Sequence, residues 1–376
     1  MAKPKVVCVV GTRPEAIKMA PVVLELRKFP AVETVLASTG QHKEMLEQAL
    51  HAFGLTADED LAIMQHGQTL AEVTARAVEG LDKLYQRIEP TWVLGQGDTT
   101  TVFASALTAF YRQVPFGHIE AGLRTTTIDN PFPEEFNRRA AGLVAALHFA
   151  PTKWSADNLA REGKDASTVF VTGNTGIDAV LQMARTSQDE WYPNHKGRVV
   201  LLTTHRRENW GDPQRGIARA ALRLVEKFED VLLVVPMHRN PNVREVLTSI
   251  LGGHPRIELI EPPDYDKFVK LLKRSTIVLS DSGGVQEEGP AFGIPVLVLR
   301  DTTERPEGVD AGTAKLVGTN EEAIFAEGNK LLEDSKAFDA MAHAVSPYGD
   351  GRASERIRYV LLKELGFESP EVKMWL

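Results

Sequence analysis

The chain has 376 residues, of which 43% are hydrophobic and 25% charged, a composition typical of a folded globular protein and not of a disordered or fibrous one. Its net charge of -8 argues against nonspecific binding to nucleic acid or to an anionic membrane. The single cysteine, Cys8, excludes an intramolecular disulfide, and we expect a cytoplasmic protein with no membrane span and no secretory leader. At this length we expect two domains, each with its own core.

Short β-branched runs alternate along the chain with longer stretches of helical period, a pattern typical of βαβ units around parallel sheets. In the first half, strands are predicted at 5–10, 32–39, 91–96, 115–121, 147–151 and 168–172. Residues 99–112 are predicted to be helical, with one face formed by Val102, Ala106, Ala109 and Phe110. A polar break at 185–197 indicates a linker or domain edge.

The alternation restarts after this break. Further strands are predicted at 198–205, 231–238, 256–261, 276–282 and 294–300, and the tail from about 352 is predicted to be a helix. Polar residues follow or close many of the predicted strands, namely Arg13, His42, Asp98, Glu120, His205, His238 and Ser282. Because ligands bind outside the carboxyl ends of parallel strands, two such edges facing each other predict a site between the domains.

The segment SDSGGVQEEG at 280–289 is a candidate phosphate site. Glycines at 283 and 284 let the backbone approach an anion, and the helix start offers free N–H groups. Glu288 is placed to accept hydrogen bonds from ribose hydroxyls. The alternative is that Ser282 only caps a helix.

A second candidate anion site is GTRPEAIK at 11–18, which would bring Arg13 and Lys18 to the end of the cleft. The motifs GxGxxG, GxxxxGK[ST] and HExxH are absent from the sequence, so we expect no nicotinamide or flavin cofactor, no kinase chemistry and no metal.

Three carboxylates, Asp98 in GQGDTTT, Glu120 in HIEAGLRT and Glu134 in NPFPEEFNRR, are predicted at one sheet edge. Asp98 could instead cap a helix starting at Thr99, and Glu134 could simply favour a helix N-terminus. Glu120 ends an apolar strand, where a carboxylate needs a partner or a raised pKa. Carboxylates packed together push their pKa values apart, so that one site can hold an acid and a base. His205, in HRREN, could stabilise a leaving group.

Taken together, the motifs GTRPEAIKMAP, GQGDTTT, HIEAGLRT, NPFPEEFNRR, TGNTGIDA, THRREN and DSGGVQEEGPAFGIPVLVLRDTTERPE resemble the non-hydrolysing UDP-N-acetylglucosamine 2-epimerases. The resemblance implies an α/β fold of two Rossmann-like, doubly wound domains in a GT-B arrangement, with the active site in the interdomain cleft. It implies an N-terminal acid–base domain, 1–175, joined by a C-terminal helix, 353–376, and a UDP-binding domain, 176–352.

The implied activity is reversible inversion at C2, converting UDP-GlcNAc to UDP-ManNAc without a cofactor. The family's route is anti elimination of UDP to 2-acetamidoglucal, followed by re-addition of UDP. The alternatives are an epimerase of a 2,3-diacetamido sugar nucleotide, a hydrolysing 2-epimerase, a GT-B glycosyltransferase and a catalytically silent sugar-nucleotide sensor. The resemblance also implies a homodimer and a role in cell-surface polysaccharide synthesis.

Residue by residue, the resemblance implies four acid–base candidates, Asp98, Glu120, Glu134 and His205. The implied substrate-binding candidates are Arg13, Lys18, His238, Phe268 beside the uracil, Ser282, Gly283, Gly284, Glu288 and Arg305. Many bacterial relatives bind a second UDP-GlcNAc as an activator, and the candidates for such an allosteric site are Gln41, His42 and Arg206. Here Glu44 replaces a usual glutamine and Gly67 replaces an arginine, so we predict weak or absent activation by substrate.

Overall fold

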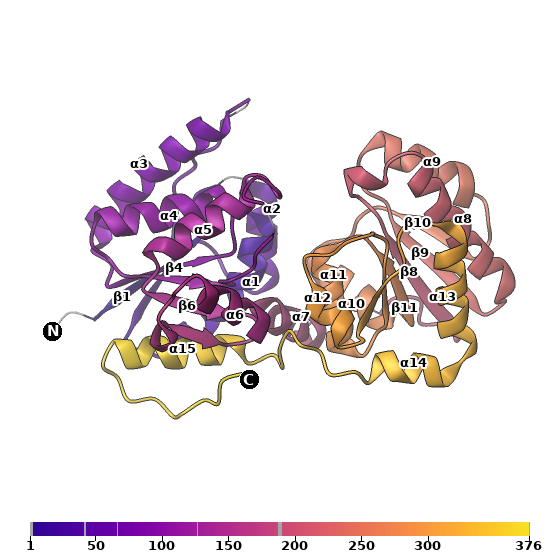
Figure 1. Ribbon diagram of the computed structural model, residues 1–376. Helices are drawn as coiled ribbons and strands as arrows, with labels where there is room; N and C mark the ends of the chain where they lie inside the picture. Colours follow the sequence, from indigo (N-terminus) through magenta and orange to yellow (C-terminus); the bar gives the residue numbers. More distant parts are fainter. Residues whose placement is uncertain (1–2, 41–42, 66, 126, 187–189, 376) are drawn as a thin grey trace. The chain divides into compact units, whose positions relative to one another are not determined.

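The computed structural model describes residues 3–40, 43–65, 67–125, 127–186 and 190–375. The chain divides into two compact units: unit 1 comprises Met1–Ala179 and Tyr348–Leu376, and unit 2 comprises Val180–Pro347. Each unit contains one sheet whose described strands pair in parallel, with helices connecting successive strands (Figure 1). The predicted α/β class with two doubly wound sheets is confirmed.

The sheet of unit 1 has seven strands in the order β3-β2-β1-β4-β5-β6-β7. The strands are β1 (Lys5–Val10), β2 (Glu33–Ser38), β3 (Glu59–Asp60), β4 (Trp92–Gln96), β5 (Phe116–Ile119), β6 (Leu147–Ala150) and β7 (Val169–Val171). The helices are α1 (Arg13–Arg27), α2 (Lys43–Ala52), α3 (Leu70–Ile88), α4 (Thr100–Tyr111), α5 (Glu134–Val144), α6 (Lys153–Arg161), the short 3₁₀ helix η1 (Ala166–Thr168) and α15 (Ala353–Glu364). Helix α7 (Thr175–Thr186) spans the boundary between the units.

The sheet of unit 2 has six strands in the order β10-β9-β8-β11-β12-β13. The strands are β8 (Arg198–Thr203), β9 (Val231–Pro236), β10 (Ile257–Ile260), β11 (Ile277–Ser280), β12 (Val296–Val298) and β13 (Ala314–Leu316). The helices are α8 (Asp212–Lys227), α9 (Pro241–Leu251), α10 (Tyr265–Arg274), α11 (Gly283–Glu288), α12 (Pro306–Asp310), α13 (Glu321–Glu333) and α14 (Ser335–Ala342), with 3₁₀ helices η2 (Arg207–Asn209) and η3 (Gly289–Phe292).

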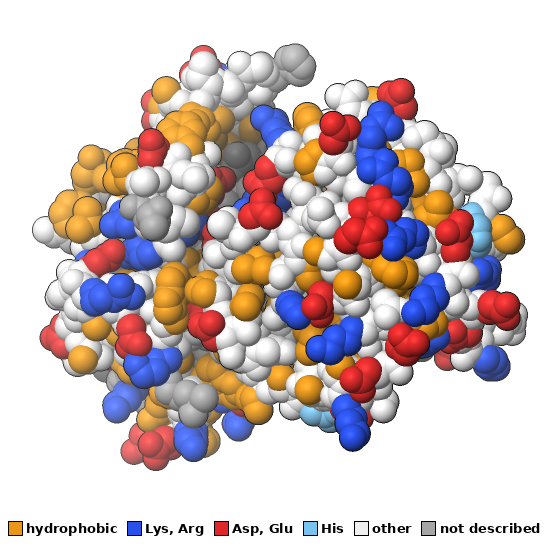
Figure 2. Space-filling view, turned by 45° about the vertical axis from the view of Figure 1, so that its right-hand side comes forward, with side chains coloured by type: hydrophobic (Ala, Val, Ile, Leu, Met, Phe, Trp, Pro, Cys, Tyr) orange, Lys and Arg blue, Asp and Glu red, His pale blue; other side chains and the backbone are white. Residues whose placement is uncertain are grey.

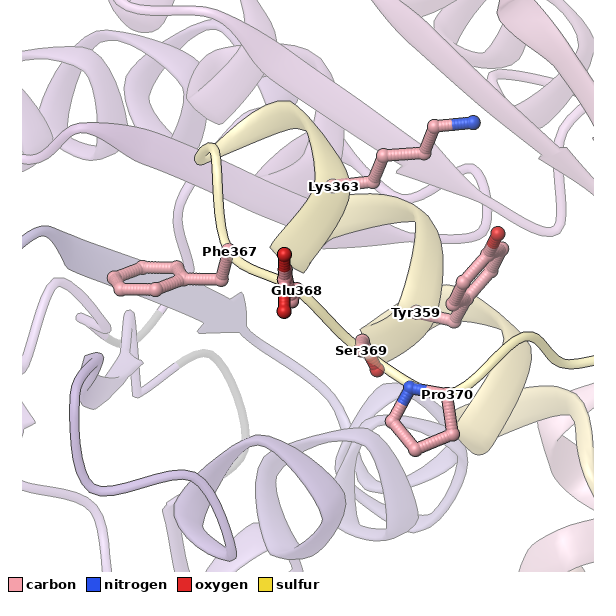
Figure 3. Close-up of a pocket in the computed structure, with 6 residues that line it drawn as sticks. All are labelled: Tyr359, Lys363, Phe367, Glu368, Ser369 and Pro370. Carbon is pink, nitrogen blue, oxygen red and sulfur yellow. The ribbon is translucent and has the colours of Figure 1, made fainter.

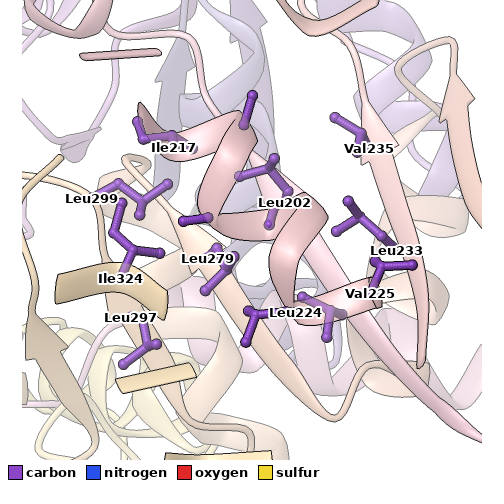
Figure 4. Packing of buried hydrophobic residues seen from close by; sticks show 14 of the residues in the cluster. Leu202, Ile217, Leu224, Val225, Leu233, Val235, Leu279, Leu297, Leu299 and Ile324 are labelled. Carbon is purple, nitrogen blue, oxygen red and sulfur yellow. The ribbon is translucent and has the colours of Figure 1, made fainter. Parts of the chain in front are cut away.

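The core of unit 2 shows why these runs form strands. Leu202 of β8 and Leu279 of β11 point to the same face of the sheet and are fully buried with Ile217 and Leu224 of α8 (Figure 4). Residues on the opposite face of the same strands, such as Val278, belong to a second buried cluster. Since both sheet faces are covered, the strands are apolar throughout, as central parallel strands require. Truncating one such leucine to alanine costs about 2–5 kcal/mol.

The C-terminal segment returns to unit 1. The Asp178 carboxylate accepts hydrogen bonds from the backbone N–H groups of Ala353 (3.1 Å) and Ser354 (2.8 Å), which begin α15. Beyond the helix, the backbone N–H of Trp375 donates to the carbonyl of Val171 in β7 at 2.9 Å. Figure 1 shows α15 and this tail, in yellow, along unit 1.

The structure corrects three details of the sequence-based predictions. Strands β3 and β13, with two and three residues, were not predicted. Phe110 does not join the buried face of α4 but is 58% exposed, because it lies eight residues after Val102 and is rotated by about 80° from Val102 around the helix axis. The C-terminal helix ends at Glu364 and not at 376, since Gly366 adopts a left-handed φ of +78°.

On the face visible in Figure 2, basic and acidic side chains are interspersed. Binding of an anion therefore depends on a local arrangement of groups. Among the described helices, none combines the length and apolar character needed to cross a membrane.

Candidate active site

In unit 1, strand order reverses between β1 and β4. Arg13 is the first residue of the helix after β1, and Asp98 lies in the loop after β4. Ligand sites of doubly wound sheets lie at such a switch point. Thr99, and not Asp98, is the N-cap of α4, and its hydroxyl accepts a hydrogen bond from the N–H of Val102 at 3.3 Å. The capping interpretation of Asp98 is therefore wrong, and its carboxylate is available for other contacts.

The Asp98 carboxylate contacts Arg138 of α5, with Nη2 and Oδ2 2.5 Å apart. Burial raises the pKa of Asp98, and the nearby charges of Glu120 and Glu134 raise it further, while Arg138 opposes the shift. The side chain is still 25% exposed. Asp98 is thus a carboxyl group with a raised pKa and a partly exposed side chain, which makes it a candidate for an acid–base role.

Glu120 follows β5 directly and has a left-handed backbone, with φ of +63°. This conformation is costly for a residue with a Cβ and is found where surrounding contacts hold it in place. Here the carboxylate accepts hydrogen bonds from Gln96 Nε2 at 2.7 Å and Asn174 Nδ2 at 3.2 Å, and pairs with Lys18 Nζ. The sequence indicated that this carboxylate needs a partner. The structure shows that the partner is Lys18 and that two side-chain amides add hydrogen bonds.

Glu134 is the first residue of α5 and is half-buried. Its charge raises the pKa of Asp98, which places the two carboxylates in one electrostatic cluster. The next residue, Glu135, is fully buried and is already bonded to the N–H of Thr125 (3.1 Å) and to Arg139 Nε (2.6 Å). The structure thus brings Asp98, Glu120 and Glu134 together and leaves Glu135 a structural role.

The GTRPEAIK segment begins α1 with a capping box between Thr12 and Glu15. The buried Glu15 carboxylate accepts hydrogen bonds from the N–H groups of Gly11 (3.1 Å) and Thr12 (2.7 Å), and from the Thr99 hydroxyl (2.7 Å). Burial raises its pKa to about 7. Arg13 is exposed at the first helical position. Glu15 therefore ties the turn just before Arg13 to Thr99, the residue after Asp98.

In unit 2, strand order reverses between β8 and β11, whose last residues Thr203 and Ser280 are paired in register. Asp281 follows β11 and is fully buried. Its Oδ1 lies 2.9 Å from His205 Nδ1, and the His205 and His238 rings are 6.2 Å apart, centroid to centroid. His205 thus lies at the switch point of this sheet, and the ring of His238, which follows the neighbouring strand β9, lies beside it.

The first residue of α11, Gly283, lies against Arg305. A Cβ added at Gly283 would be 3.1 Å from Arg305 Cζ, whereas one at Gly284 would meet only Ser282 Oγ, at 4.0 Å. Arg305 Nε donates to Glu287 at 2.6 Å, which fixes the guanidinium. Ser282 is the N-cap of α11, but its side chain makes no capping hydrogen bond, so the capping alternative does not account for the hydroxyl.

The candidate nucleoside-binding residue Glu288 is bonded to Tyr265 of α10, the helix that also carries Phe268. The Tyr265 hydroxyl donates to Glu288 Oε1 at 3.2 Å, and burial, with the charge of Glu288, raises the pKa of the phenol. Phe268, one turn along α10, packs half-buried against the core of unit 2. Tyr265 thus remains a donor that holds the Glu288 carboxylate.

Of the allosteric candidates, Gln41 and His42 lie outside the described residues. Arg206 donates its backbone N–H to Asp281 at 3.0 Å. Gly67 is exposed, with φ of +73°, and Glu44 is exposed in the first turn of α2.

A cavity of about 650 Å³ lies between α15 and the C-terminal tail (Figure 3). Its lining residues are Tyr359, Lys363, Phe367, Glu368, Ser369 and Pro370. The candidate catalytic and substrate-binding residues do not contribute to this lining. The cavity is therefore distinct from the two strand-end clusters.

The residues of these clusters that were not predicted as site residues include Asp281, Arg138, Asn174 and Tyr265. Asp281 had a signal, because it is a charged residue directly after an apolar strand. Asn174 stands in TGNTG, a turn before a helix. Arg138 stands in the motif NPFPEEFNRR, four residues after Glu134, whereas Tyr265 is an ordinary helix residue that nothing local in the sequence distinguishes.

Two parallel sheets, one with carboxylates near its switch point and the other with a His–Asp pair and with Gly283 against Arg305, form the arrangement of an α/β enzyme. The particular family follows from comparison with known proteins. Residues 24–362 match the family model of UDP-N-acetylglucosamine 2-epimerase, and the chain belongs to this family.

The relatives span the chain. The UDP-N-acetylglucosamine 2-epimerase of Bacillus subtilis is 50% identical over 373 residues, covering 99% of this chain and 98% of the relative. The crystal structure of UDP-GlcNAc 2-epimerase from Neisseria meningitidis bound to UDP-GlcNAc is 46% identical, with a TM-score of 0.88 and coverage of 96% of this chain and 100% of that chain. A glycosyltransferase of kitacinnamycin, 13% identical with a TM-score of 0.67, shows likeness of fold alone. The fold is thus GT-B-like.

Proposed function

We propose that the chain catalyses reversible C2 epimerisation of UDP-GlcNAc to UDP-ManNAc by anti elimination of UDP and re-addition to 2-acetamidoglucal. The family and the names of the relatives support the substrate and the reaction. The observation that carries the proposal is the pair of differently poised carboxylates in unit 1. Asp98 has a raised pKa, whereas Glu120 is ion-paired with Lys18.

The chemistry requires such a pair. The C2 hydrogen has no adjacent ketone to acidify it, so its removal must be coupled to departure of UDP from C1. Inversion then requires a proton to be delivered to the opposite face of C2. In the proposal, Asp98, Glu120 and Glu134 share these proton transfers, because carboxyl groups in different environments can serve as base and acid at the same pH.

The residues of unit 2 supply the leaving-group end in this proposal. Arg305 and the backbone around Ser282, Gly283 and Gly284 bind the diphosphate and stabilise the charge that develops as UDP departs. Arg13 contributes a further cation from unit 1, and His205 and His238 complete the phosphate surroundings.

The uridine end would be held by groups on α10 and α11. Glu288, fixed by Tyr265, accepts from the ribose hydroxyls, and Phe268 lies beside the uracil. The proposal needs no redox cofactor and no metal, because every transfer in it is of a proton or of UDP.

Incubation of UDP-GlcNAc with the enzyme in D2O tests the proposal. We expect UDP-ManNAc to form, with deuterium at C2 of the recovered sugar nucleotides, as seen by NMR and mass spectrometry. Free ManNAc with UDP would show a hydrolysing enzyme. Absence of deuterium from C2 would indicate a glycosyltransferase or a sensor instead of an epimerase. A parallel incubation with a 2,3-diacetamido sugar nucleotide tests whether the related compound is the substrate.

The homodimer and the cytoplasmic location stay predictions. Light scattering coupled to gel filtration measures the first, since a dimer of a 41.4 kDa chain is readily separated from the monomer.

A further inference from the structure

Asp281 is the most heavily bonded carboxylate at the switch point of unit 2. Its Oδ2 accepts from the Thr204 hydroxyl (2.9 Å), the backbone N–H groups of His205 (2.9 Å) and Arg206 (3.0 Å), and Asn209 Nδ2 (3.0 Å). Its Oδ1 faces His205, with Nδ1 at 2.9 Å and the backbone N–H at 3.1 Å. The two oxygens therefore differ: Oδ2 takes four bonds from the loop after β8, whereas Oδ1 contacts the imidazole and shares with Oδ2, at the longer distance, only the backbone N–H of His205.

The side chain remains a carboxylate in this buried place. Burial by itself raises the pKa of Asp281, but the hydrogen bond and charge of His205, with the backbone N–H groups, lower it more, and the net shift is downward. An ionised Oδ1 can only accept, so the nitrogen that faces it must carry the proton. Nε2, on the opposite edge of a side chain that is 43% exposed, is then the nitrogen presented outward.

We propose that Asp281 is a positioning residue that acts through His205, fixing the ring orientation and the tautomer in which Nδ1 bears the proton and Nε2 is offered to the substrate. The inference rests on the proposed function in one respect, namely that His205 takes part in epimerisation. A neutral imidazole without such a partner populates both tautomers and several rotamers, so only a fraction of molecules would present Nε2 correctly.

Asp281→Asn separates the two tasks of the carboxylate. The amide has one oxygen, and the four donors around the Oδ2 position will retain it, because turning the NH₂ group toward them would oppose donor to donor. The NH₂ group then faces His205 Nδ1 and favours the wrong tautomer. The loop is kept while the imidazole contact is inverted.

We expect Asp281→Asn to lower kcat by about 10²-fold or more, with the Kd for UDP changed by less than about threefold. Thr204→Val is the matched control. It removes one donor from Oδ2 but leaves the contact between Oδ1 and Nδ1, and its kcat should stay close to that of the wild type. A loss in this control as large as in Asp281→Asn would show that Asp281 serves only the loop and would overturn the proposal.

A double-mutant cycle adds the decisive readout. In a His205→Gln background, Asp281→Asn should change kcat by less than about threefold, since there is no imidazole left to position. The same fold-loss in both backgrounds would contradict action through His205. If His205→Gln alone keeps the wild-type kcat, then His205 takes no part in epimerisation. That outcome contradicts the proposed role of His205 and is distinct from the question of which tautomer Asp281 fixes.

The tautomer can also be measured without any substitution. Two-dimensional ¹H–¹⁵N NMR of the wild-type protein, with His205 assigned from the His205→Gln spectrum, should show Nδ1 protonated when the ring is neutral. A ring protonated at Nε2 would exclude the proposed contact even if Asp281→Asn fails to fold.

Discussion

Lys18 of α1 donates a hydrogen bond to Glu120 Oε1, a pairing of residues 102 positions apart in sequence. Glu120 itself has a backbone φ of +63°, and holding a non-glycine residue there costs about 1–2 kcal/mol. The ion pair, with Gln96 and Asn174, is what holds the carboxylate in this conformation. The resemblance assigns Lys18 to UDP, whereas the structure places it on an acid–base candidate.

Lys18→Met therefore tests which assignment is right. We expect kcat to fall by about 10²-fold and the Kd for UDP to change by less than about threefold, because the lost partner belongs to Glu120. Arg13→Gln is the comparison, and it should weaken UDP binding by about tenfold, since Arg13 is an exposed cation on the proposed phosphate side. Titration calorimetry with UDP measures both. If Lys18→Met weakens UDP binding as much as Arg13→Gln does, then Lys18 binds the diphosphate.

Asp98→Asn removes the carboxyl group with the raised pKa while keeping its shape. We expect turnover to fall by about 10²-fold or more, with nearly intact UDP binding, as loss of a general acid–base group predicts. Initial rates of UDP-ManNAc formation and UDP calorimetry provide the measurement. Activity near the wild-type rate would remove Asp98 from the mechanism.

The strand ends were predictable because one rule of parallel sheets sends their carboxyl ends to one edge, and Asp98 and His205 both follow apolar runs. The Rossmann-like alternation was equally visible, since buried parallel strands are apolar on both faces. Strand β3 could not be predicted, because it consists of only two residues, Glu59 and Asp60, which are too few to show a hydrophobic periodicity.

Partnerships across long sequence separations were also beyond prediction. His205 meets Asp281 at a separation of 76 residues, and Asp178 caps a helix 175 residues later, at Ala353. Composition and period describe single segments, so they indicate that a buried carboxylate needs a partner but do not name it. For Glu120 the sequence predicted only that a partner is needed, and the structure shows that this partner is Lys18.

The two glycines that begin α11 offer a steric test with a built-in comparison. Gly283→Ala places a Cβ 3.1 Å from the Arg305 guanidinium, which Glu287 holds in place, so Arg305 or the start of the helix must shift. We expect the Kd for UDP to rise by about tenfold. Gly284→Ala, whose Cβ meets only Ser282 Oγ at 4.0 Å, should cost distinctly less. Equal effects of the two substitutions on UDP calorimetry would show that Arg305 does not contact the bound nucleotide.

The departures at Glu44 and Gly67 predict the shape of the rate curve. Loss of a positive charge beside a second diphosphate weakens its binding, so initial rate against UDP-GlcNAc concentration should be hyperbolic. The reverse reaction from UDP-ManNAc should start without a lag and without added UDP-GlcNAc. A strongly sigmoidal curve, or a requirement for trace UDP-GlcNAc, would contradict the prediction.

Two capping boxes give the chain opposite pH responses. Burial raises the pKa of Glu15 to about 7 from an ordinary 4.5, so the folded state holds this proton more tightly than the unfolded state does. The contribution of Glu15 to stability is then fully present below about pH 4.5 and is lost as pH rises through about 7.

Glu15→Gln cannot titrate, so the Tm of the wild type relative to this variant should fall between pH 5 and pH 8, on the order of 5 °C. The exposed box of Thr69 and Glu72 is the control, because hydrogen bonds from Thr69 lower the pKa of Glu72. Its contribution is lost only on acidification, so the difference between wild type and Glu72→Gln should stay constant from pH 5 to pH 8. If the Tm difference between the wild type and Glu15→Gln is equally constant, then Glu15 is ionised throughout this pH range. The hydrogen bonds from Gly11, Thr12 and Thr99 to Glu15 then do not depend on pH.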